Sequence, residues 1–231
     1  MATLYIVATP IGNLGDITLR AIDILKSVDL ILCEDTRQTQ KLLDHYEIKT
    51  KTISYHQHSK LNKAEYIFQL LKEGKNLALV SDAGTPGISD PGNQLVRRIM
   101  DVRYPLIRIV PIPGPSALTA AVSISGLPMD RFLFLGFPPV KNKRKKFFEE
   151  AVRQLADSKY PVIFYESPYR IIKTLKELSS LRAKELSSLA VVVCRELTKK
   201  FETIYRGTIE DVLEQLEKEE IRGEFVVIIG K

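Results

Sequence analysis

The sequence predicts a two-domain α/β protein, with a parallel sheet in its N-terminal half and a mixed sheet in its C-terminal half. In the N-terminal half, short apolar runs alternate with amphipathic stretches, which is typical of strand–helix–strand units. In the C-terminal half, several apolar runs follow one another without a full helix between them, which favours a mixed sheet. A segment with three prolines and one glycine, residues 111–116, resembles a hinge. We therefore predict one domain over residues 1–112 and a second over residues 113–231.

The first domain is expected to contain five strands, at residues 4–8, 29–33, 53–56, 77–80 and 106–110. The helix after the first strand is expected to bury Leu19, Ile22 and Leu25, with Asp16 or Thr18 as its N-cap. Further helices are expected through residues 42–43, over 63–72 and over 94–100.

The loop at residues 80–92 is the most distinctive stretch of the sequence. It contains three glycines, two prolines and two aspartates, and it follows an apolar strand. Glycines let a ligand approach the backbone, and prolines fix the path of the chain. Asp90 is a plausible N-cap for the next helix, with Pro91 at its first position. A loop of this kind at the carboxyl end of a strand predicts a ligand site, and an ordinary tight turn is the alternative.

The second domain is expected to contain strands at residues 131–137, 161–166, 189–194, 201–206 and 225–229. Ser116 is a plausible cap of the helix at 117–122, where free N–H groups could meet a ligand; a plain capped linker is the alternative. Residues 141–146 carry five positive charges and open another helix. This basic run predicts a phosphate contact, and a solvated loop is the alternative.

The composition excludes several classes of protein. The net charge of +6 is compatible with an anionic partner. Cys33 and Cys194 lie in apolar runs, so we expect buried thiols and neither a disulfide nor a zinc site. His56 and His58 have no third ligand nearby in the sequence, so no metal site is predicted. The sequence lacks a dinucleotide fingerprint, a P-loop, a basic leader and an apolar run of membrane length, so we expect a cytoplasmic protein.

Several motifs, taken together, resemble one family. They are residues 8–16 (ATPIGNLGD), 34–37 (EDTR), 54–56 (SYH), 80–92, 113–117 (PGPSA), 164–170 (FYESPYR), 195–199 (RELTK) and 222–224 (RGE). This set is similar to the tetrapyrrole methylase superfamily of S-adenosylmethionine-dependent methyltransferases, and within it to bacterial enzymes that modify small-subunit ribosomal RNA. The resemblance spans essentially the whole chain. It implies the two-domain class III methyltransferase fold, a homodimer, and cofactor bound in the cleft between the domains. It also implies 2′-O-methylation of a cytidine in 16S rRNA near the decoding centre, on RNA within the small ribosomal subunit.

The resemblance also implies which residues form the site. The expected cofactor-binding residues are Pro10, Asp82, Ala83, Gly84, Thr85, Ser89, Ser116, Ala117, Tyr165 and Leu197. The candidates for the general base, each at the end of a strand, are Asp35, Glu166 and Glu196. The candidates for RNA binding are Arg37, Lys143, Arg144, Lys145, Arg170, Arg195 and Lys199. For each charged residue the alternative is a structural ion pair, and for Asp82 it is a brace within its own turn.

Two other functions stay open from the sequence. One is a methylase of a small tetrapyrrole, which the chain-wide motifs and the basic run disfavour. The other is an RNA-binding assembly factor without catalytic activity, which cofactor binding would distinguish from an enzyme.

Overall fold

The computed structural model describes residues 2–55, 61–90, 92–101, 107–158, 160–181 and 189–231. The chain divides into two compact units, Met1–Ser116 and Ala117–Lys231, called unit one and unit two below. This division lies four residues after the predicted boundary at 112/113. None of the helices in the described ranges combines the length and the apolar character needed to cross a membrane.

Unit one is built on a five-stranded parallel sheet. Its strands are β1 (Ala2–Val7), β2 (Leu30–Cys33), β3 (Thr52–Ser54), β4 (Leu77–Leu79) and β5 (Ile107–Ile112). Their order across the sheet is β3-β2-β4-β1-β5, and each neighbouring pair is parallel. The alternation of apolar runs with amphipathic stretches in the sequence therefore predicted this sheet correctly.

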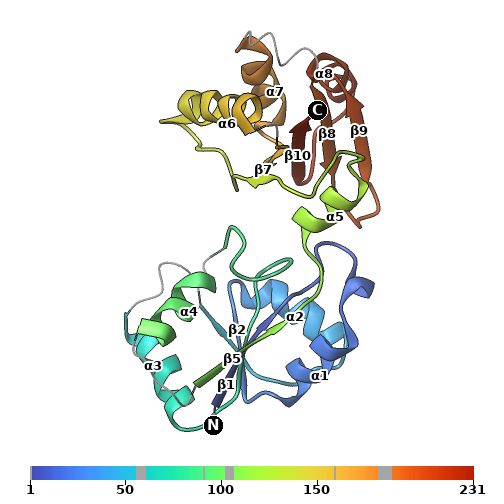
Figure 1. The fold of residues 1–231 in the computed structure, drawn as a ribbon. Helices are drawn as coiled ribbons and strands as arrows, with labels where there is room; N and C mark the ends of the chain where they lie inside the picture. Colours follow the sequence, from blue (N-terminus) through green and yellow to red (C-terminus); the bar gives the residue numbers. More distant parts are fainter. Residues whose placement is uncertain (1, 56–60, 91, 102–106, 159, 182–188) are drawn as a thin grey trace. The chain divides into compact units, whose positions relative to one another are not determined.

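Helices cover both faces of this sheet (Figure 1). They are α1 (Leu19–Ser27), α2 (Thr36–His45), α3 (Leu61–Lys72) and α4 (Gly92–Asp101), with a 3₁₀ turn, η1, at Leu14–Asp16. One buried cluster joins α1 and α2 to the sheet, and a second joins α3 and α4 to its other face. Both faces are thus buried, which explains why the strands read as continuous apolar runs.

Two details of unit one differ from the prediction. Leu19 is 82% exposed, because the buried face of α1 runs through Ala21 and Leu25, and Leu19 lies about 200° around the helix from Ala21. Pro111 belongs to β5 instead of the hinge, where it pairs with Ile6. A proline is tolerated there because β5 is an edge strand, whose outer side needs no N–H donor.

Unit two contains a mixed five-stranded sheet. Its strands are β6 (Leu133–Phe134), β7 (Val162–Glu166), β8 (Ala190–Arg195), β9 (Thr203–Gly207) and β10 (Phe225–Gly230). Their order is β6-β7-β10-β8-β9, with β6 and β7 parallel and the other pairs antiparallel. The mixed sheet is as predicted, but β6 covers only two of the seven residues expected at 131–137.

Helices also cover this second sheet. They are α5 (Ala117–Ile124), α6 (Arg144–Ser158), α7 (Ile171–Ser180) and α8 (Ile209–Glu217). Apolar residues of α6, α7 and α8 form one cluster with Val162, Phe164, Val191 and Val227 of the sheet. The helix α5 packs against β10. Each unit therefore has its own hydrophobic core.

Candidate active site

The carboxyl end of the unit-one sheet gathers the loops that the sequence singles out. All five strands are parallel, so the loops after β1, β2, β4 and β5 emerge at the same end. The neighbouring strands β1 and β4 lead to α1 and α4, which lie on opposite faces of the sheet (Figure 1). This arrangement is a topological switch point, where open α/β sheets bind their ligands.

Hydrogen bonds tie these loops into one platform. Thr9 and Gly84 exchange two backbone hydrogen bonds of 2.9 and 3.0 Å, which join the first loop to the loop at 80–90. The hydroxyl of Thr85 donates to the carbonyl of Pro115 over 3.0 Å and so joins the latter loop to the hinge. The site is therefore held by contacts between segments more than 25 residues apart.

Two glycines are required where these loops approach one another. Gly84 has φ of +81°, and a Cβ there would lie 3.2 Å from the side chain of Ile11. A Cβ at Gly114 would lie 3.0 Å from that of Ala8. Any larger residue would push the loops apart, so the two glycines set the shape of the platform.

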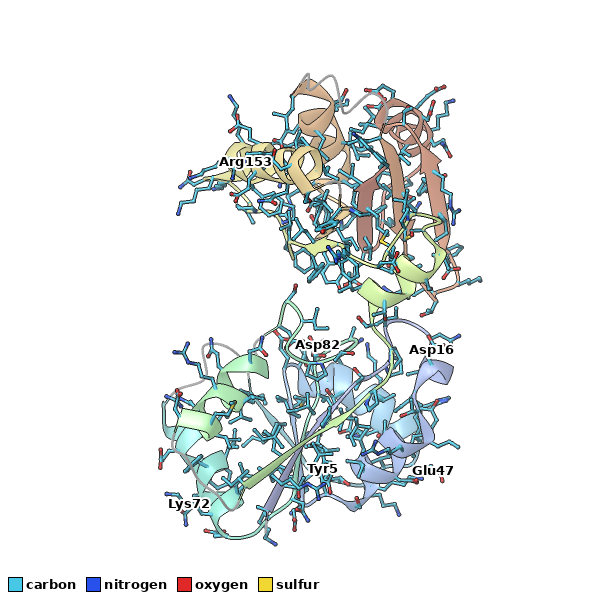
Figure 2. All side chains as sticks on the ribbon, viewed as in Figure 1. Tyr5, Asp16, Glu47, Lys72, Asp82 and Arg153 are labelled. Carbon is cyan, nitrogen blue, oxygen red and sulfur yellow. The ribbon has the colours of Figure 1, made fainter. Side chains whose placement is uncertain are left out.

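Asp82 lies on this platform and links it to the loop after β2 (Figure 2). Its Oδ1 accepts a hydrogen bond of 2.9 Å from the N–H of Asp35. Asp82 is exposed, whereas Gly84 is buried. An exposed carboxylate with one oxygen fixed by a backbone donor is suited to hold an ammonium or hydroxyl group of a ligand.

Asp35 caps α2 and pairs with Arg37. Its carboxylate accepts from the backbone N–H of Arg37 at 2.8 Å and from the guanidinium of Arg37 at 2.6 Å. These two interactions lower the pKa of Asp35 to about 2. A carboxylate with so low a pKa is a weak proton acceptor, which disfavours Asp35 as the general base.

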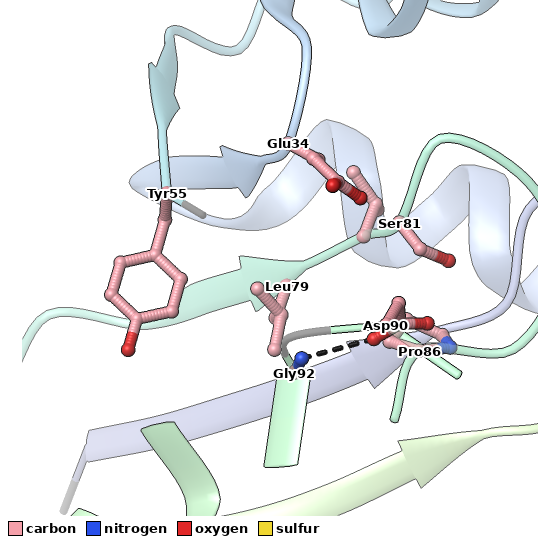
Figure 3. Close-up of a pocket in the computed structure, with 8 residues that line it drawn as sticks. Glu34, Tyr55, Leu79, Ser81, Pro86, Asp90 and Gly92 are labelled. Atoms are coloured by element: carbon pink, nitrogen blue, oxygen red, sulfur yellow. Dashed lines mark hydrogen bonds between the residues drawn. The ribbon is translucent and has the colours of Figure 1, made fainter. Parts of the chain in front are cut away.

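A small, partly open hollow borders the loop at 80–90. Figure 3 shows the residues that line it, which include Glu34, Tyr55, Ser81 and Asp90. Asp90 accepts from the N–H groups of Gly87 and Gly92 at 2.6 and 2.9 Å, so its carboxylate braces the loop and the start of α4. Pro91, predicted at the first position of that helix, and the histidines His56 and His58 lie outside the described residues.

Glu166, a predicted general base at the end of β7, is a buried structural group. Its side chain is fully buried, and one carboxylate oxygen accepts from the N–H of Ser167 and from Arg170, each at 2.8 Å. The other oxygen accepts from the hydroxyl of Thr174 at 2.6 Å and from Arg144 at 3.3 Å. A buried carboxylate enclosed by four donors is poorly placed to accept a proton from a substrate, which disfavours Glu166 as the general base.

Arg144 is likewise not a surface residue. Its guanidinium is 5% exposed and donates to Glu177 at 2.6 Å, to the Pro139 carbonyl at 3.2 Å, and to Glu166 and Thr174. These partners occupy its donors, so Arg144 does not fit the predicted role in phosphate binding. Its neighbours Lys143 and Lys145 are exposed, as that role requires.

The loop after β8 forms a second network. Glu196 accepts from Lys199 at 2.8 Å and from the N–H of Glu224 at 2.9 Å. Burial alone would raise the pKa of Glu196, but these hydrogen bonds outweigh it and lower the pKa. Gly223 packs against this carboxylate, since a Cβ there would lie 2.2 Å from Cγ of Glu196. Glu196 is therefore poorly suited to accept a proton.

Two more residues that were predicted to bind RNA, Arg195 and Lys199, donate their hydrogen bonds within unit two. Arg195 donates to the carbonyls of Arg222 and Glu220 and to the carboxylate of Glu219, over 2.8 to 3.0 Å. Lys199 bridges Glu196 and Glu224. The guanidinium of Arg195 thus has internal partners, which favours the alternative of a structural group over its predicted role in binding RNA.

The remaining predicted residues fall into three groups by position. Those on the unit-one platform are Pro10, Ala83, Gly84, Thr85, Ser89 and Ser116. Those in unit two are Ala117 at the start of α5, Tyr165 near the end of β7 and Leu197 in the loop after β8. Arg37 is exposed on α2 and Arg170 lies just before α7.

Sequence reasoning missed Thr174 and Glu177, because nothing local marks two residues of an amphipathic helix as partners of Arg144.

The family model of the tetrapyrrole (corrin/porphyrin) methylases matches residues 3–213. The chain belongs to this family. The prediction of the family is therefore confirmed, together with those of a methyltransferase and of S-adenosylmethionine as its methyl donor.

Individual relatives agree with this assignment. The chain is 45% identical over 230 residues to a ribosomal RNA small subunit methyltransferase I from Synechocystis, covering 100% of this chain and 79% of that protein. It is 47% identical to the protein of the same name from Bacillus subtilis, covering 99% and 75%. The structure of uroporphyrin III C-methyltransferase from Thermus thermophilus superimposes with a TM-score of 0.64 at 16% identity, over 99% of this chain and 97% of that one. The predicted two-domain fold class of this family is confirmed.

Proposed function

We propose that this protein transfers a methyl group from S-adenosylmethionine to the ribose 2′-hydroxyl of a cytidine in the RNA of the small ribosomal subunit. The observation that carries the proposal is the similarity to ribosomal RNA small subunit methyltransferases I, at 45 to 47% identity over 99 to 100% of this chain. Similarity to tetrapyrrole methyltransferases of known structure is far lower, at 16 to 21%, and supports the fold alone.

The platform of unit one suits this cofactor. Its loops bring glycine backbone close to a ligand site at the switch point, and Asp82 offers an exposed carboxylate beside them. We propose that Asp82 binds the ammonium or the ribose hydroxyls of S-adenosylmethionine, and that the backbone of residues 83–85 and the segment around Ser116 line its surface. The resemblance adds Pro10, Ser89, Ala117, Tyr165 and Leu197 to the proposed set.

The residues of this chain must position the reactants, exclude water and accept the hydroxyl proton. S-adenosylmethionine supplies an electrophilic methyl group on its sulfonium. Of the three predicted bases, Glu166 is enclosed, and hydrogen bonds lower the pKa of both Asp35 and Glu196. We therefore propose that positioning of the ribose hydroxyl contributes more to catalysis than proton transfer to a strongly basic carboxylate.

Methylation of ribosomal RNA tests the proposal. Small subunits from a strain that lacks this modification are incubated with the protein and S-adenosylmethionine labelled in its methyl group, and the RNA is digested to nucleosides. We expect labelled 2′-O-methylcytidine from the small-subunit RNA. Asp82→Ala is expected to reduce both this incorporation and the affinity for S-adenosylhomocysteine in calorimetry. Label on a base, or only on an added tetrapyrrole, would contradict the proposal.

The resemblance further suggests a cytoplasmic homodimer, and closed twofold dimers are the commonest assembly of soluble proteins. We propose this state for the working enzyme. Sedimentation at micromolar concentration should give twice the mass of the 231-residue chain, and a monomer would count against it.

A further inference from the structure

Three aromatic side chains of unit two are exposed to an unusual degree. Among the described residues of this unit, Phe137 is 54% exposed, Phe201 is 69% exposed and Tyr169 is 94% exposed. A single exposed ring is common on protein surfaces and needs no explanation. A group of rings at one place on the fold does need one.

The topology brings these rings to the same end of the sheet. The strands β6, β7 and β8 run in the same direction, because β6 is parallel to β7 and both β7 and β8 are antiparallel to β10. Phe137 lies three residues after β6, Tyr169 three residues after β7, and Phe201 six residues after β8. The rings therefore stand on three loops at the same end of the sheet, with β6 beside β7 and only β10 between β7 and β8.

The loops that carry the rings are fixed by internal contacts. The carboxylate of Glu166 binds the N–H of Ser167 and the side chain of Arg170, which brackets Tyr169. In the loop before Phe201, the N–H of Thr198 donates to Glu202 over 2.6 Å. The ring of Phe137 packs against that of Tyr165, with centroids 5.2 Å apart. Loops held in this way lose little backbone freedom when the rings that they carry bind a ligand.

Lysines accompany the rings on the same loops. Lys200 precedes Phe201, and its Nζ lies 5.5 Å from the centre of that ring. Lys141 and Lys143 follow Phe137 on the same loop and are exposed. Interfaces between proteins are depleted in lysine, whereas exposed rings beside lysines are typical of surfaces that bind single-stranded nucleic acid.

We propose that Phe137, Tyr169 and Phe201 form a stacking surface for unpaired bases of the RNA substrate, with Lys143 and Lys200 at its phosphates. This inference rests on the proposed function and names the part of the chain that holds the RNA. Stacking is available to every base, so the surface positions a single strand without reading its sequence.

Binding of a fluorescein-labelled single-stranded RNA of 20 nucleotides tests the inference. Tyr169→Ala and Phe201→Ala are each expected to weaken this binding by about 5- to 100-fold, and Tyr169→Phe to restore it. The slope of log affinity against log salt should stay unchanged in both alanine variants, since no charge is removed. Lys200→Ala should instead lower that slope by about 0.7 for one lost phosphate contact.

Tyr66→Ala is the matched control, because Tyr66 is also exposed, at 51%, but lies on α3 of unit one. It should leave RNA binding unchanged. The alanine variants should keep the wild-type unfolding midpoint, sedimentation coefficient and affinity for S-adenosylhomocysteine.

The possible failures are distinguishable. Wild-type protein that neither binds nor methylates RNA would overturn the proposed function and this inference together. Wild-type protein that methylates RNA while Tyr169→Ala and Phe201→Ala bind as tightly as before would overturn the stacking surface alone. A changed sedimentation coefficient in these variants would show that the rings contact a second copy of the chain. That result would also overturn the stacking surface.

Discussion

At the scale of single residues, neighbouring groups decide backbone conformations that the residue type alone does not favour. Glu196 and Thr198 adopt left-handed backbone angles, with φ of 51° and 65°, which are rare outside glycine. The carboxylate of Glu196 then occupies the space beside Gly223. The sequence Arg222-Gly223-Glu224 therefore owes its glycine to a side chain 27 residues away in the sequence.

Gly223→Ala should be far more destabilising than Gly74→Ala. The two glycines have almost the same φ, +88° and +86°, but a Cβ at Gly74 meets nothing within 4 Å. Both substitutions incur about 1–2 kcal/mol for the left-handed angle. Gly223→Ala incurs about 1–3 kcal/mol more from overpacking against Glu196. Urea unfolding measures the difference, and equal losses would show that the Glu196 side chain moves aside freely.

The carboxyl of Asp35 is expected to titrate at a pKa of about 2, below its ordinary value of 3.8, because the guanidinium and the N–H of Arg37 bind its charged form. Since the folded-state pKa is lowered, the stabilisation is present above pH 3.8 and is lost as the pH falls through about 2. Carboxyl NMR on the wild type measures the pKa directly. Arg37→Ala should raise it toward 3.8, and an unshifted value in both proteins would refute the pairing.

At the scale of helices and strands, one buried cluster of charged residues links two helices of unit two to its sheet. Glu166 ends β7, Arg144 begins α6, and Thr174 and Glu177 lie on α7. Their contacts join two helices to the strand that carries Tyr165, a proposed cofactor-binding residue. The cluster therefore acts on the site by fixing the loop after β7.

Glu166→Ala should destabilise the protein by about 3–5 kcal/mol, because it removes one of the two carboxylates that pair with the buried guanidinium of Arg144 and the acceptor of the Thr174 hydroxyl. Glu149→Ala is the control, since Glu149 forms only an exposed pair with Lys145 at 3.8 Å and should cost less than about 1 kcal/mol. Chemical denaturation at neutral pH compares the two. A similar small loss for both would mean that the buried cluster contributes little.

At the scale of the whole molecule, the residues proposed to bind the cofactor belong to two units with separate cores. Asp82 and Ser116 belong to unit one, whereas Tyr165 and Leu197 belong to unit two. Neither unit therefore holds the complete set of proposed contacts.

S-adenosylhomocysteine should bind the full chain but not residues 1–116 or 117–231 alone, as measured by calorimetry. Circular dichroism of each fragment verifies that it has folded, which its own buried core predicts. Binding by one folded fragment with the affinity of the full chain would show that the other unit contributes no contact.

The sequence by itself determined the alternation of strands and helices, the loop at 80–92 and the cap of α1. Thr18, one of two predicted candidates, caps α1 in the structure, whereas the cap of α2, Asp35, was predicted only as a candidate base. These features depend on residues within a few positions of one another, where backbone sterics and hydrogen bonding decide the outcome. The motifs also indicated the family, because most of them lie at the end of a strand that a local apolar run identifies.

Only the tertiary structure decided which charged residues are available for chemistry. Arg144 lies in a run of five positive charges, yet it is the one that turns inward to Glu166, which no local pattern distinguishes. Pro111 fits a strand solely because β5 lies at the edge of its sheet. In both cases the partner lies more than 20 residues away in the sequence. Pairing with Glu166 sets the role of the Arg144 side chain, and pairing with Ile6 sets the place of Pro111 in the fold.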